Sequence, residues 1–288
     1  MRVLVYGQLV KKEDANEWKM TVDELLKNEF AVYIFEEILS QYHTLVGFNE
    51  NINTFNLVSD IDLILTLGGD GTMIKASTIA CKKDIPLVGI NLGRLGFLSS
   101  VEKSKIKSAI DKIKRKKFTI EKRAMLSLEC NLPLFDNEDS ALNDITIHKR
   151  DTSSMMTIHT YIDGTYLNTY WADGLIIATP TGSTGYSLAC GGPIIFPGSG
   201  NFVITPIAPH SLNVRPLVIQ DDVKISFEIE GRAENYLCTL DSRYEIITEE
   251  YKISVKKSKF NTKLLTLEGL NFMGTIRDKL LWGLDKRN

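Results

Sequence analysis

The chain has 288 residues, 43% of them hydrophobic, and a formal net charge of −2. This length allows two domains with cores of their own, and the weak charge excludes a general attraction to nucleic acid or to anionic lipid. Its four cysteines (Cys81, Cys130, Cys190 and Cys238) lack a C-x-x-C pair, so the sequence predicts neither a zinc site nor a disulfide framework.

The N-terminal segment is predicted to be a strand and not a targeting signal. Residues 1–7 form an apolar run that is too short and too soon polar for a signal peptide. No later apolar run is long enough to span a bilayer. We therefore expect a cytoplasmic protein that makes no membrane contact.

The first third of the chain alternates short apolar strands with helical patterns. Strands are expected at 3–6, 31–35, 63–67 and 86–91, and Trp18, Val22, Leu25 and Leu26 recur at helical spacing between the first two. Such alternation predicts a parallel sheet covered on both faces. Ligands bind such sheets beyond the carboxyl ends of the strands.

A glycine-rich turn follows the third of these strands. It consists of Gly68, Gly69, Asp70, Gly71 and Thr72, and a helix is expected from Met73. The three glycines are expected to allow positive φ and the close approach of an anion, with the helix N-terminus adding donors. A carboxylate here suits a site where a hydroxyl loses its proton as phosphate arrives. The turn favours phosphoryl transfer, whereas a tight strand-to-helix connection with Asp70 near the N-cap is the alternative.

A basic stretch at 103–123 comes next. Five cations are crowded into 112–117, while Ile106, Ile110 and Ile113 repeat at helical spacing beneath them. This pattern is typical of an amphipathic helix with a solvated face, which we favour over a nucleic-acid patch in a chain of this charge.

Beyond residue 118 the pattern changes to strands, so the second domain is expected to be mostly antiparallel. Strands are expected at 119–121, 125–130, 145–148, 157–162, 166–170, 175–178, 223–229, 237–240 and 253–255, with a hairpin turn at Asp163-Gly164. The segment 275–284 is expected to be a helix that returns to the first domain. The predicted domains are an α/β domain of 1–120 with about 270–288, and a β-rich domain of 121–269.

A second polar turn lies at the end of the strand 175–178. It is rich in Thr, Ser and Gly over 179–187, which offers hydroxyl and backbone groups to a polar ligand. We favour a ligand site over a purely structural turn. Tyr186 would give a base a flat surface, although an aromatic residue here also suits the core.

Several kinds of site can be set aside. The chain has no G-x-x-x-x-G-K-[ST] phosphate loop and no G-x-G-x-x-G fingerprint. The four histidines (His43, His148, His159 and His210) show no spacing for a metal or a triad, so structural roles are expected for them. We assign no protein ligand to a metal.

Five segments in this order resemble the bacterial NAD kinases. They are Gly68–Thr72, Asn91–Phe97, Ala141–Asp144, Asp173–Pro193 and Pro206–Leu212, and the resemblance extends over about 62–281. The glycine-aspartate turn alone is less specific, because lipid kinases and phosphofructokinases carry similar versions.

The resemblance implies roles for individual residues. Asp70 matches the proton acceptor for the 2′-hydroxyl of the adenosine ribose, and Gly68, Gly69, Gly71 and Thr72 match the phosphate-binding turn. The residues implied to bind NAD are Asp70, Gly71, Lys75, Asn143, Asp144, Trp171, Asp173, Thr184, Gly185, Tyr186, Ser187, Leu188, Ala189 and Arg243. Acidic and amide groups suit ribose hydroxyls and adenine edges, and a glycine turn suits phosphates.

This chain departs from the family pattern at four of these positions. Asp144 stands where Glu is usual, Gly185 where Ala is usual, and Ala189 where Ser is common. Arg243, in a D-S-R turn where D-G-Q is common, is expected to meet a ligand phosphate.

The resemblance thus implies an ATP-dependent NAD kinase, a transferase of NADP biosynthesis, with its site between the two domains. Magnesium or another divalent cation is expected to arrive with ATP. The implied partners are NAD and ATP, without nucleic acid or membrane, in a homodimer or homotetramer. Two alternatives stay open: a kinase for a lipid or another alcohol, against which the polar 179–186 loop argues, and a dinucleotide sensor without catalysis, against which Asp70 argues.

Overall fold

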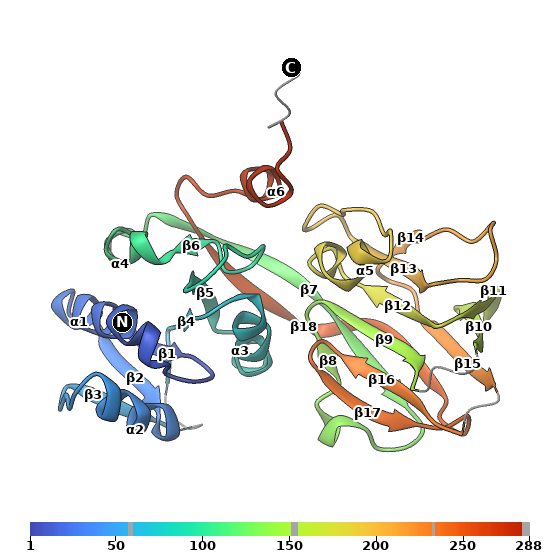
Figure 1. Cartoon of the computed structure of the whole chain (residues 1–288), viewed down its shortest axis with the longest axis horizontal. Coiled ribbons are helices and arrows are strands. Elements are labelled where there is room, and N and C mark those ends of the chain that lie inside the picture. The colour runs from blue at the N-terminus through green and yellow to red at the C-terminus, as the bar shows by residue number, and fades with distance from the viewer. Residues whose placement is uncertain (57–59, 151–154, 232–233, 284–288) are drawn as a thin grey trace. The chain divides into compact units, whose positions relative to one another are not determined.

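The computed structural model describes residues 1–56, 60–150, 155–231 and 234–283 (Figure 1). The chain divides into two compact units: Met1–Lys122 with Thr262–Asn288, and Arg123–Asn261. The helices are α1 (Ala15–Lys27), α2 (Glu36–Leu45), α3 (Asp70–Lys83), α4 (Ile106–Lys114), α5 (Tyr186–Ala189) and α6 (Phe272–Leu280), with 3-10 turns η1 (Lys12–Asp14), η2 (Lys103–Lys105), η3 (Phe135–Asn137) and η4 (Gly182–Thr184).

The first unit is built on a parallel sheet, as the alternating pattern predicts. Its strands are β1 (Arg2–Tyr6), β2 (Ala31–Phe35), β3 (Ile52–Phe55), β4 (Leu63–Leu67), β5 (Pro86–Asn91) and the short β6 (Val101–Glu102). The order is β5-β4-β1-β2-β3 and all of these pairs are parallel. The strand order therefore reverses direction between β1 and β4, and ligands of such sheets bind at this kind of point, beyond the carboxyl ends.

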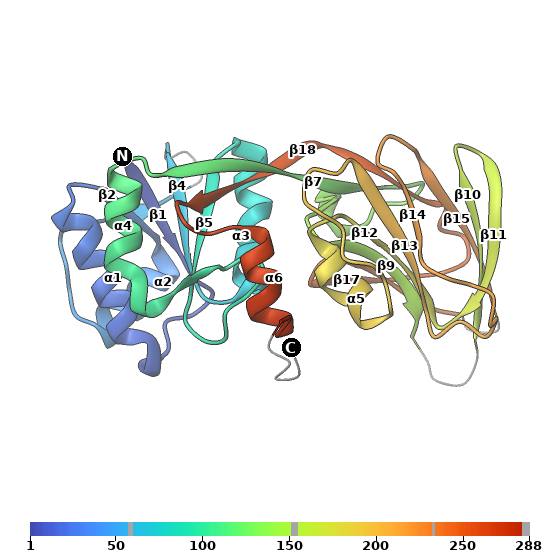
Figure 2. The same ribbon diagram turned by 90° about the horizontal axis from the view of Figure 1, so that it is seen from above.

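Helices cover both faces of this sheet. Alternate residues of β4 explain how: Leu63 and Leu65 pack in one core with Trp18 of α1 and Ile110 of α4, while the Thr66 hydroxyl donates to Met73 Sδ of α3, 2.9 Å away. Side chains alternate across a strand, so α1 and α4 lie on one face and α3 on the other. Figure 2 shows α1 and α4 side by side.

The stretch of basic residues forms the expected amphipathic helix. In α4 the buried residues are Ile106, Ala109, Ile110 and Ile113. Two of the lysines form hydrogen bonds with the backbone of neighbouring segments. Lys112 Nζ donates to the carbonyl of Glu268 at 2.7 Å, and Lys114 Nζ donates to the carbonyl of Asn28 at 2.6 Å. These contacts support a solvated helix face that holds loops of its own unit.

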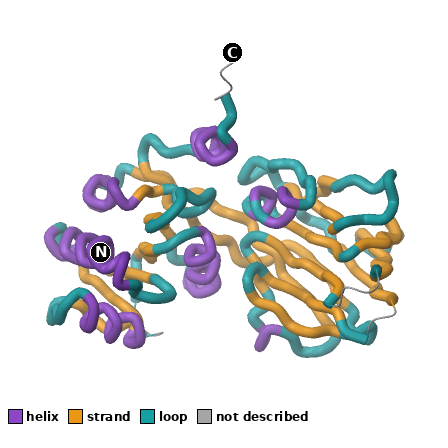
Figure 3. The backbone as a smooth tube through the Cα atoms, in the orientation of Figure 1, coloured by secondary structure: helices purple, strands orange, loops and turns teal. Residues whose placement is uncertain are grey.

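The second unit is mostly antiparallel sheet, as expected, and Figure 3 shows how strongly strands predominate in it. Its strands are β8 (Ser140–Ala141), β9 (Asp144–Lys149), β10 (Met156–Ile162), β11 (Thr165–Ala172), β12 (Gly174–Ala178), β13 (Asn201–Ile207), β14 (Leu217–Gln220), β15 (Ile225–Gly231), β16 (Tyr236–Leu240) and β17 (Arg243–Ile247). A six-stranded sheet has the order β14-β13-β12-β9-β16-β17. In this unit β11, β10, β15 and the start of β18 (Ile253–Leu267) pair side by side, and both sets of strands supply residues to one core.

The hairpin at Asp163-Gly164 is confirmed. It joins β10 and β11, which pair from Met156 opposite Ala172 to Ile162 opposite Thr165. Both turn residues have positive φ, 48° and 78°, which is the geometry that two-residue hairpins favour.

Several of the strand ranges predicted from the sequence were wrong at their boundaries. The strands expected at 119–121 and 125–130 are one strand, β7 (Phe118–Cys130), and the one expected at 253–255 is the start of β18 (Ile253–Leu267). The strand expected from Val223 begins at Ile225. The helix expected at 275–284 is α6, which lies in the first unit as predicted and whose Lys279 bonds the carbonyl of Leu95; Leu284 lies outside the described residues.

All four cysteines are free thiols. Within the described part of the chain, no helix is long and apolar enough to cross a membrane.

Candidate active site

Asp70 is the first residue of α3, so the helix begins three residues before the expected Met73. Its carboxylate accepts three backbone hydrogen bonds: Oδ2 from Phe97 N at 2.7 Å, and Oδ1 from Leu98 N at 3.1 Å and Ser99 N at 2.9 Å. A Cβ on Gly96 would lie 1.8 Å from Asp70 Oδ1, so only glycine fits there. The two family-like segments 68–72 and 91–97 are thereby joined through one carboxylate.

The three glycines of the turn have different roles, and only Gly68 uses the positive φ that the sequence allows at all three. Gly68 has φ +149°, and a Cβ there would meet the Thr72 hydroxyl at 2.3 Å, so the fold itself requires this glycine. Gly69 and Gly71 have ordinary backbone, and no atom lies within 4 Å of an added Cβ. Since the fold leaves both positions open, they admit a bulky group to the main chain.

Thr72 and Lys75 follow on the same helix. Thr72 is buried under Gly68, whereas Lys75 is exposed and donates from Nζ to Gln8 Oε1 at 2.9 Å. The first unit thus gathers Asp70, Gly71 and Lys75 on α3, at the carboxyl edge of its sheet.

In the second unit, the segment before β9 packs directly on the polar turn after β12. Thr179 donates from its hydroxyl to the Leu142 carbonyl at 2.6 Å and from its backbone N–H to the Asn143 carbonyl at 2.9 Å. A Cβ on Gly182 would lie 2.1 Å from that same carbonyl. The amide oxygen of Asn143 is buried and has no hydrogen-bond donor among the described residues. A buried acceptor without a partner is rare in folded proteins, so Asn143 Oδ1 is suited to a ligand.

The side chain of Asp241 holds the backbone of residues 142–144 in place. Its carboxylate accepts from Leu142 N at 2.8 Å, Asn143 N at 2.7 Å and Asp144 N at 3.2 Å. Burial raises the pKa of Asp241, and the three amide donors oppose that rise. The sequence placed Asp241 in a turn of the family pattern, but nothing in it indicated this positioning role.

Asp144 is 7% exposed. Burial raises its pKa to about 7, repulsion by the Asp241 carboxylate acts in the same direction, and a hydrogen bond from Thr146 Oγ1 opposes both. Asp144 is therefore the member of this carboxylate pair that takes up a proton near neutral pH.

We expect Asp144→Asn to stabilise the protein more at high pH than at low pH. The folded-state pKa lies above the unfolded value of about 4, so the contribution of Asp144 to the free energy of unfolding is fully present below pH 4 and is lost as the pH rises through 7. Between pH 5 and pH 8 the variant should gain about 2 to 3 kcal/mol relative to the wild type. Urea unfolding at pH 5, 6, 7 and 8 measures this.

The matched control is Asp222→Asn, which changes an exposed aspartate of the same unit. A pH dependence in this variant as large as that of Asp144→Asn would show that the effect does not come from the burial of Asp144. If the difference between Asp144→Asn and the wild type is constant from pH 5 to pH 8, Asp144 is not protonated in the folded protein.

The turn after β12 leads into α5, where the implied residues differ in exposure. Gly185, Tyr186 and Ala189 are exposed, and Thr184 and Leu188 are half-buried. Ser187 is fully buried with its hydroxyl 2.8 Å from Thr205 Oγ1. Burial raises the pKa of Tyr186, and the neighbouring charges of Cys190, Asp144 and Asp173 add to the rise.

Asp173 and Trp171 lie at the other end of β12. Asp173 Oδ1 is 2.6 Å from Lys149 Nζ, and the Trp171 ring lies 4.5 Å from the His210 ring, centroid to centroid. The structure brings Asn143, Asp144 and the 179–185 turn together at one end of β12, with Asp173, Trp171 and His210 at its start.

Arg243 is engaged with protein backbone. Its guanidinium donates to the carbonyls of Glu138 at 2.8 Å and Ser140 at 2.6 Å, and it lies over the Phe135 ring. The expected contact of Arg243 with a ligand phosphate stays a prediction.

A carboxylate-bearing glycine turn at the carboxyl edge of a parallel sheet, with a polar loop rich in amide and hydroxyl groups elsewhere in the chain, is an arrangement suited to the class of nucleotide phosphotransferases. Among the described residues, no three His, Cys, Asp or Glu side chains gather as a metal ligand set.

Comparison with known proteins gives the family. Residues 3–118 match the ATP-NAD kinase N-terminal domain and residues 142–267 the ATP-NAD kinase C-terminal domain. The NAD kinase of Cytophaga hutchinsonii is 49% identical over 82% of each chain, and that of Flavobacterium psychrophilum is 42% identical over the whole of both. The chain belongs to the ATP-NAD kinase family.

Solved structures agree on the fold. Yeast NADH kinase complexed with NADH superposes with a TM-score of 0.85 at 23% identity, covering 98% of this chain and 88% of the yeast chain. An NAD kinase from Archaeoglobus fulgidus in complex with ATP gives a TM-score of 0.73 at 24% identity, covering 96% of this chain and 99% of the archaeal one.

Proposed function

We propose that this protein transfers the γ-phosphate of ATP to the 2′-hydroxyl of the adenosine ribose of NAD, with Asp70 as the general base. The bond from the 2′-oxygen to phosphorus forms, the bond between that phosphorus and the bridging oxygen of ADP breaks, and the hydroxyl proton passes to Asp70. The products are NADP and ADP. The curated relatives are NAD kinases and the archaeal structure holds ATP, which supports both substrates.

One observation carries the proposal: Asp70 lies between two glycines that the fold leaves open. A carboxylate has about four acceptor positions, and three are filled by the amides of 97–99, two at Oδ1 and one at Oδ2. The remaining position on Oδ2 is the one we assign to the ribose proton. Gly68, Gly69, Gly71 and Thr72 would then form the phosphate-binding turn, with the N–H groups of Gly69 and Gly71 as its donors. The N–H groups of Gly68 and Thr72 already donate to the carbonyls of Ile90 and Gly69, each at 3.0 Å.

The second unit contributes the groups that hold NAD. We assign the unpaired amide oxygen of Asn143 and the carboxylate of Asp144 to the adenosine half, and the exposed ring of Tyr186 to a base. Asp173, Trp171, the remaining residues of 184–189, Gly71, Lys75 and Arg243 complete the proposed set.

Magnesium is proposed to enter with ATP, because the one carboxylate in the glycine turn is already bonded to three amides. The cation neutralises charge on the transferring phosphates. We further propose a cytoplasmic protein and keep the domain division at 1–120 with about 270–288, and 121–269.

A homodimer or homotetramer is proposed as the assembly. The six-stranded sheet ends in β14 and β17, and both edge strands expose apolar side chains: Leu217 and Val218 on one, Tyr244 and Ile246 on the other. Exposed apolar edges of this kind suit pairing with a second copy.

The test is to incubate the purified protein with ATP, NAD and magnesium and to detect NADP with an NADP-specific dehydrogenase. We expect NADP to form, to cease forming when EDTA removes the cation, and to form again when magnesium is restored. NAD binding without any NADP would favour the sensor, and no NAD binding would turn the search to lipid or sugar acceptors.

A further inference from the structure

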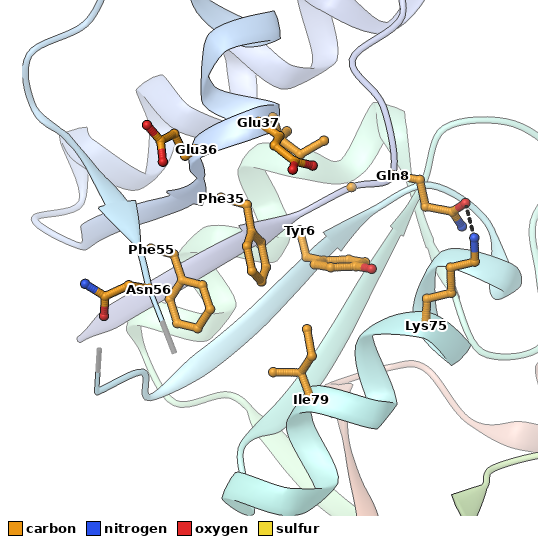
Figure 4. Close-up of a pocket in the computed structure, with 11 residues that line it drawn as sticks. Tyr6, Gln8, Phe35, Glu36, Glu37, Phe55, Asn56, Lys75 and Ile79 are labelled. Carbon is orange, nitrogen blue, oxygen red and sulfur yellow. Dashed lines mark hydrogen bonds between the residues drawn. The ribbon is translucent and has the colours of Figure 1, made fainter. Parts of the chain in front are cut away.

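A cavity of about 730 Å³ opens in the first unit, beyond the carboxyl ends of β1, β2 and β3 (Figure 4). Each strand delivers its last residues to the wall, and α3 closes one side with Lys75 and Ile79. This volume is typical of small-molecule sites, and the position is the one where ligands of parallel sheets bind. No residue implied by the family resemblance lies in this cavity except Lys75.

Three aromatic rings make one side of the cavity. Tyr6 ends β1, Phe35 ends β2 and Phe55 ends β3. The ring centroids of Tyr6 and Phe35 are 5.9 Å apart and those of Phe35 and Phe55 are 4.7 Å apart, both edge-to-face. Burial raises the pKa of Tyr6, which agrees with a wall that is partly shielded from water. Phe55 is buried and has Lys83 Nζ 5.9 Å from its ring centroid, so the half-buried rings of Tyr6 and Phe35 are the ones open to a ligand. Flat aromatic rings of this kind hold nucleic-acid bases by stacking.

Two carboxylates stand beside the rings. Glu36 and Glu37 begin α2 immediately after β2, and both are exposed. Among the residues that the structure describes, neither carboxylate has a hydrogen-bond or ion-pair partner. In nucleotide-binding α/β sheets an acidic residue in this area accepts hydrogen bonds from ribose hydroxyls. The same charges would repel phosphate, so a phosphate chain must lead away from them.

Lys75 indicates the direction in which a bound phosphate chain would run. Within the described chain its ammonium has only the neutral Gln8 amide as a hydrogen-bond partner, so its charge is available to an anion. Lys75 follows Asp70 on α3 by five residues, about 7.5 Å along the helix axis. The cation therefore lies between the aromatic wall and the glycine turn.

We propose that this cavity holds the nucleoside of the phosphate donor, with the base on the aromatic wall, the ribose hydroxyls on Glu36 and Glu37, and the phosphate chain along Lys75 toward the glycine turn. The ligand class is a purine nucleoside triphosphate. The inference rests on the proposed function, because it takes ATP as the donor.

The first measurement is binding of the non-hydrolysable imido analogue of ATP with magnesium, by titration calorimetry. Phe35→Leu and Lys75→Ala should each raise the dissociation constant about tenfold. The matched controls are Phe48→Leu, at a phenylalanine outside the cavity, and Lys82→Ala on the same helix, and both should leave it within twofold. An unchanged affinity in Phe35→Leu and Lys75→Ala would overturn the proposal.

The second measurement tests the ribose contact. Wild type should bind ATP about tenfold tighter than 2′,3′-dideoxy-ATP, and the double variant Glu36→Gln, Glu37→Gln should lose most of that preference. Equal preference in both proteins would remove the carboxylates from the site.

Steady-state kinetics distinguish a failure of this donor-site proposal from a failure of the proposed NAD kinase reaction. If wild type forms NADP and Phe35→Leu raises KM for NAD instead of KM for ATP, the cavity holds the dinucleotide and the donor assignment is wrong. If wild type forms no NADP but the analogue binds and the cavity variants weaken it, the cavity stands and the proposed reaction fails.

Discussion

Asp70→Asn should lower kcat for NADP formation about 10²- to 10⁴-fold, the range that a lost general base produces, and change the dissociation constant for NAD less than tenfold. The amide keeps the size of the carboxylate but cannot accept the 2′-hydroxyl proton. One of its atoms becomes a donor, so it can serve only some of the amides of 97–99. Steady-state kinetics and calorimetry on the same preparation give both quantities.

The control for this variant is Ser99→Ala. Its hydroxyl donates to the Gly68 carbonyl at 3.0 Å, so the alanine variant loosens the same loop from the same turn while the carboxylate remains. We expect less than a tenfold loss of kcat. A loss equal to that of Asp70→Asn would assign the effect to loop position, and parallel loss of NAD affinity and rate in Asp70→Asn would give Asp70 a binding role.

Asp241→Ala should lower the free energy of unfolding by about 3 to 5 kcal/mol, because it leaves three part-buried amide donors unpaired. The loss is partly offset, since Asp144 is relieved of a neighbouring charge. Urea unfolding monitored on the second unit's aromatic residues measures the change.

Asp241→Asn is the graded comparison. Its amide oxygen can still accept from Asn143 N and Asp144 N, which share Oδ1, while its NH₂ would face Leu142 N. The asparagine variant should therefore lose clearly less stability than the alanine variant. A loss below about 1 kcal/mol in Asp241→Ala would show that the segment before β9 is held by other contacts.

Local pattern was sufficient for the strands of the first unit. The runs at 31–35, 63–67 and 86–91 are short and mostly apolar, and all three match the observed strands. The run 63–67 is buried throughout because helices cover both faces of the sheet there. The start of α3 was placed too late because Gly71 favours a turn in sequence, whereas in the fold it lies in the first turn of the helix.

Several strands were not predicted from the sequence, for different physical reasons. β13 carries Pro206, which counts against a strand, and β17 is an edge strand whose residues are mostly polar or exposed. β3 has four residues and exposes its centre. The contact of Asp70 with the amides of 97–99 joins residues 27 or more positions apart, and side-chain direction decides it. No local pattern contains that information.

The hairpin between β16 and β17 forms hydrogen bonds with both the N–H and the carbonyl groups of residues 138–144. The Asp241 carboxylate accepts hydrogen bonds from the N–H groups of 142–144, and the Arg243 guanidinium donates to the carbonyls of Glu138 and Ser140. The backbone that presents Asn143 is thus ordered before any ligand arrives. Its conformational entropy is lost during folding and not during binding, so this stretch is preorganised and adds affinity without a further ordering cost.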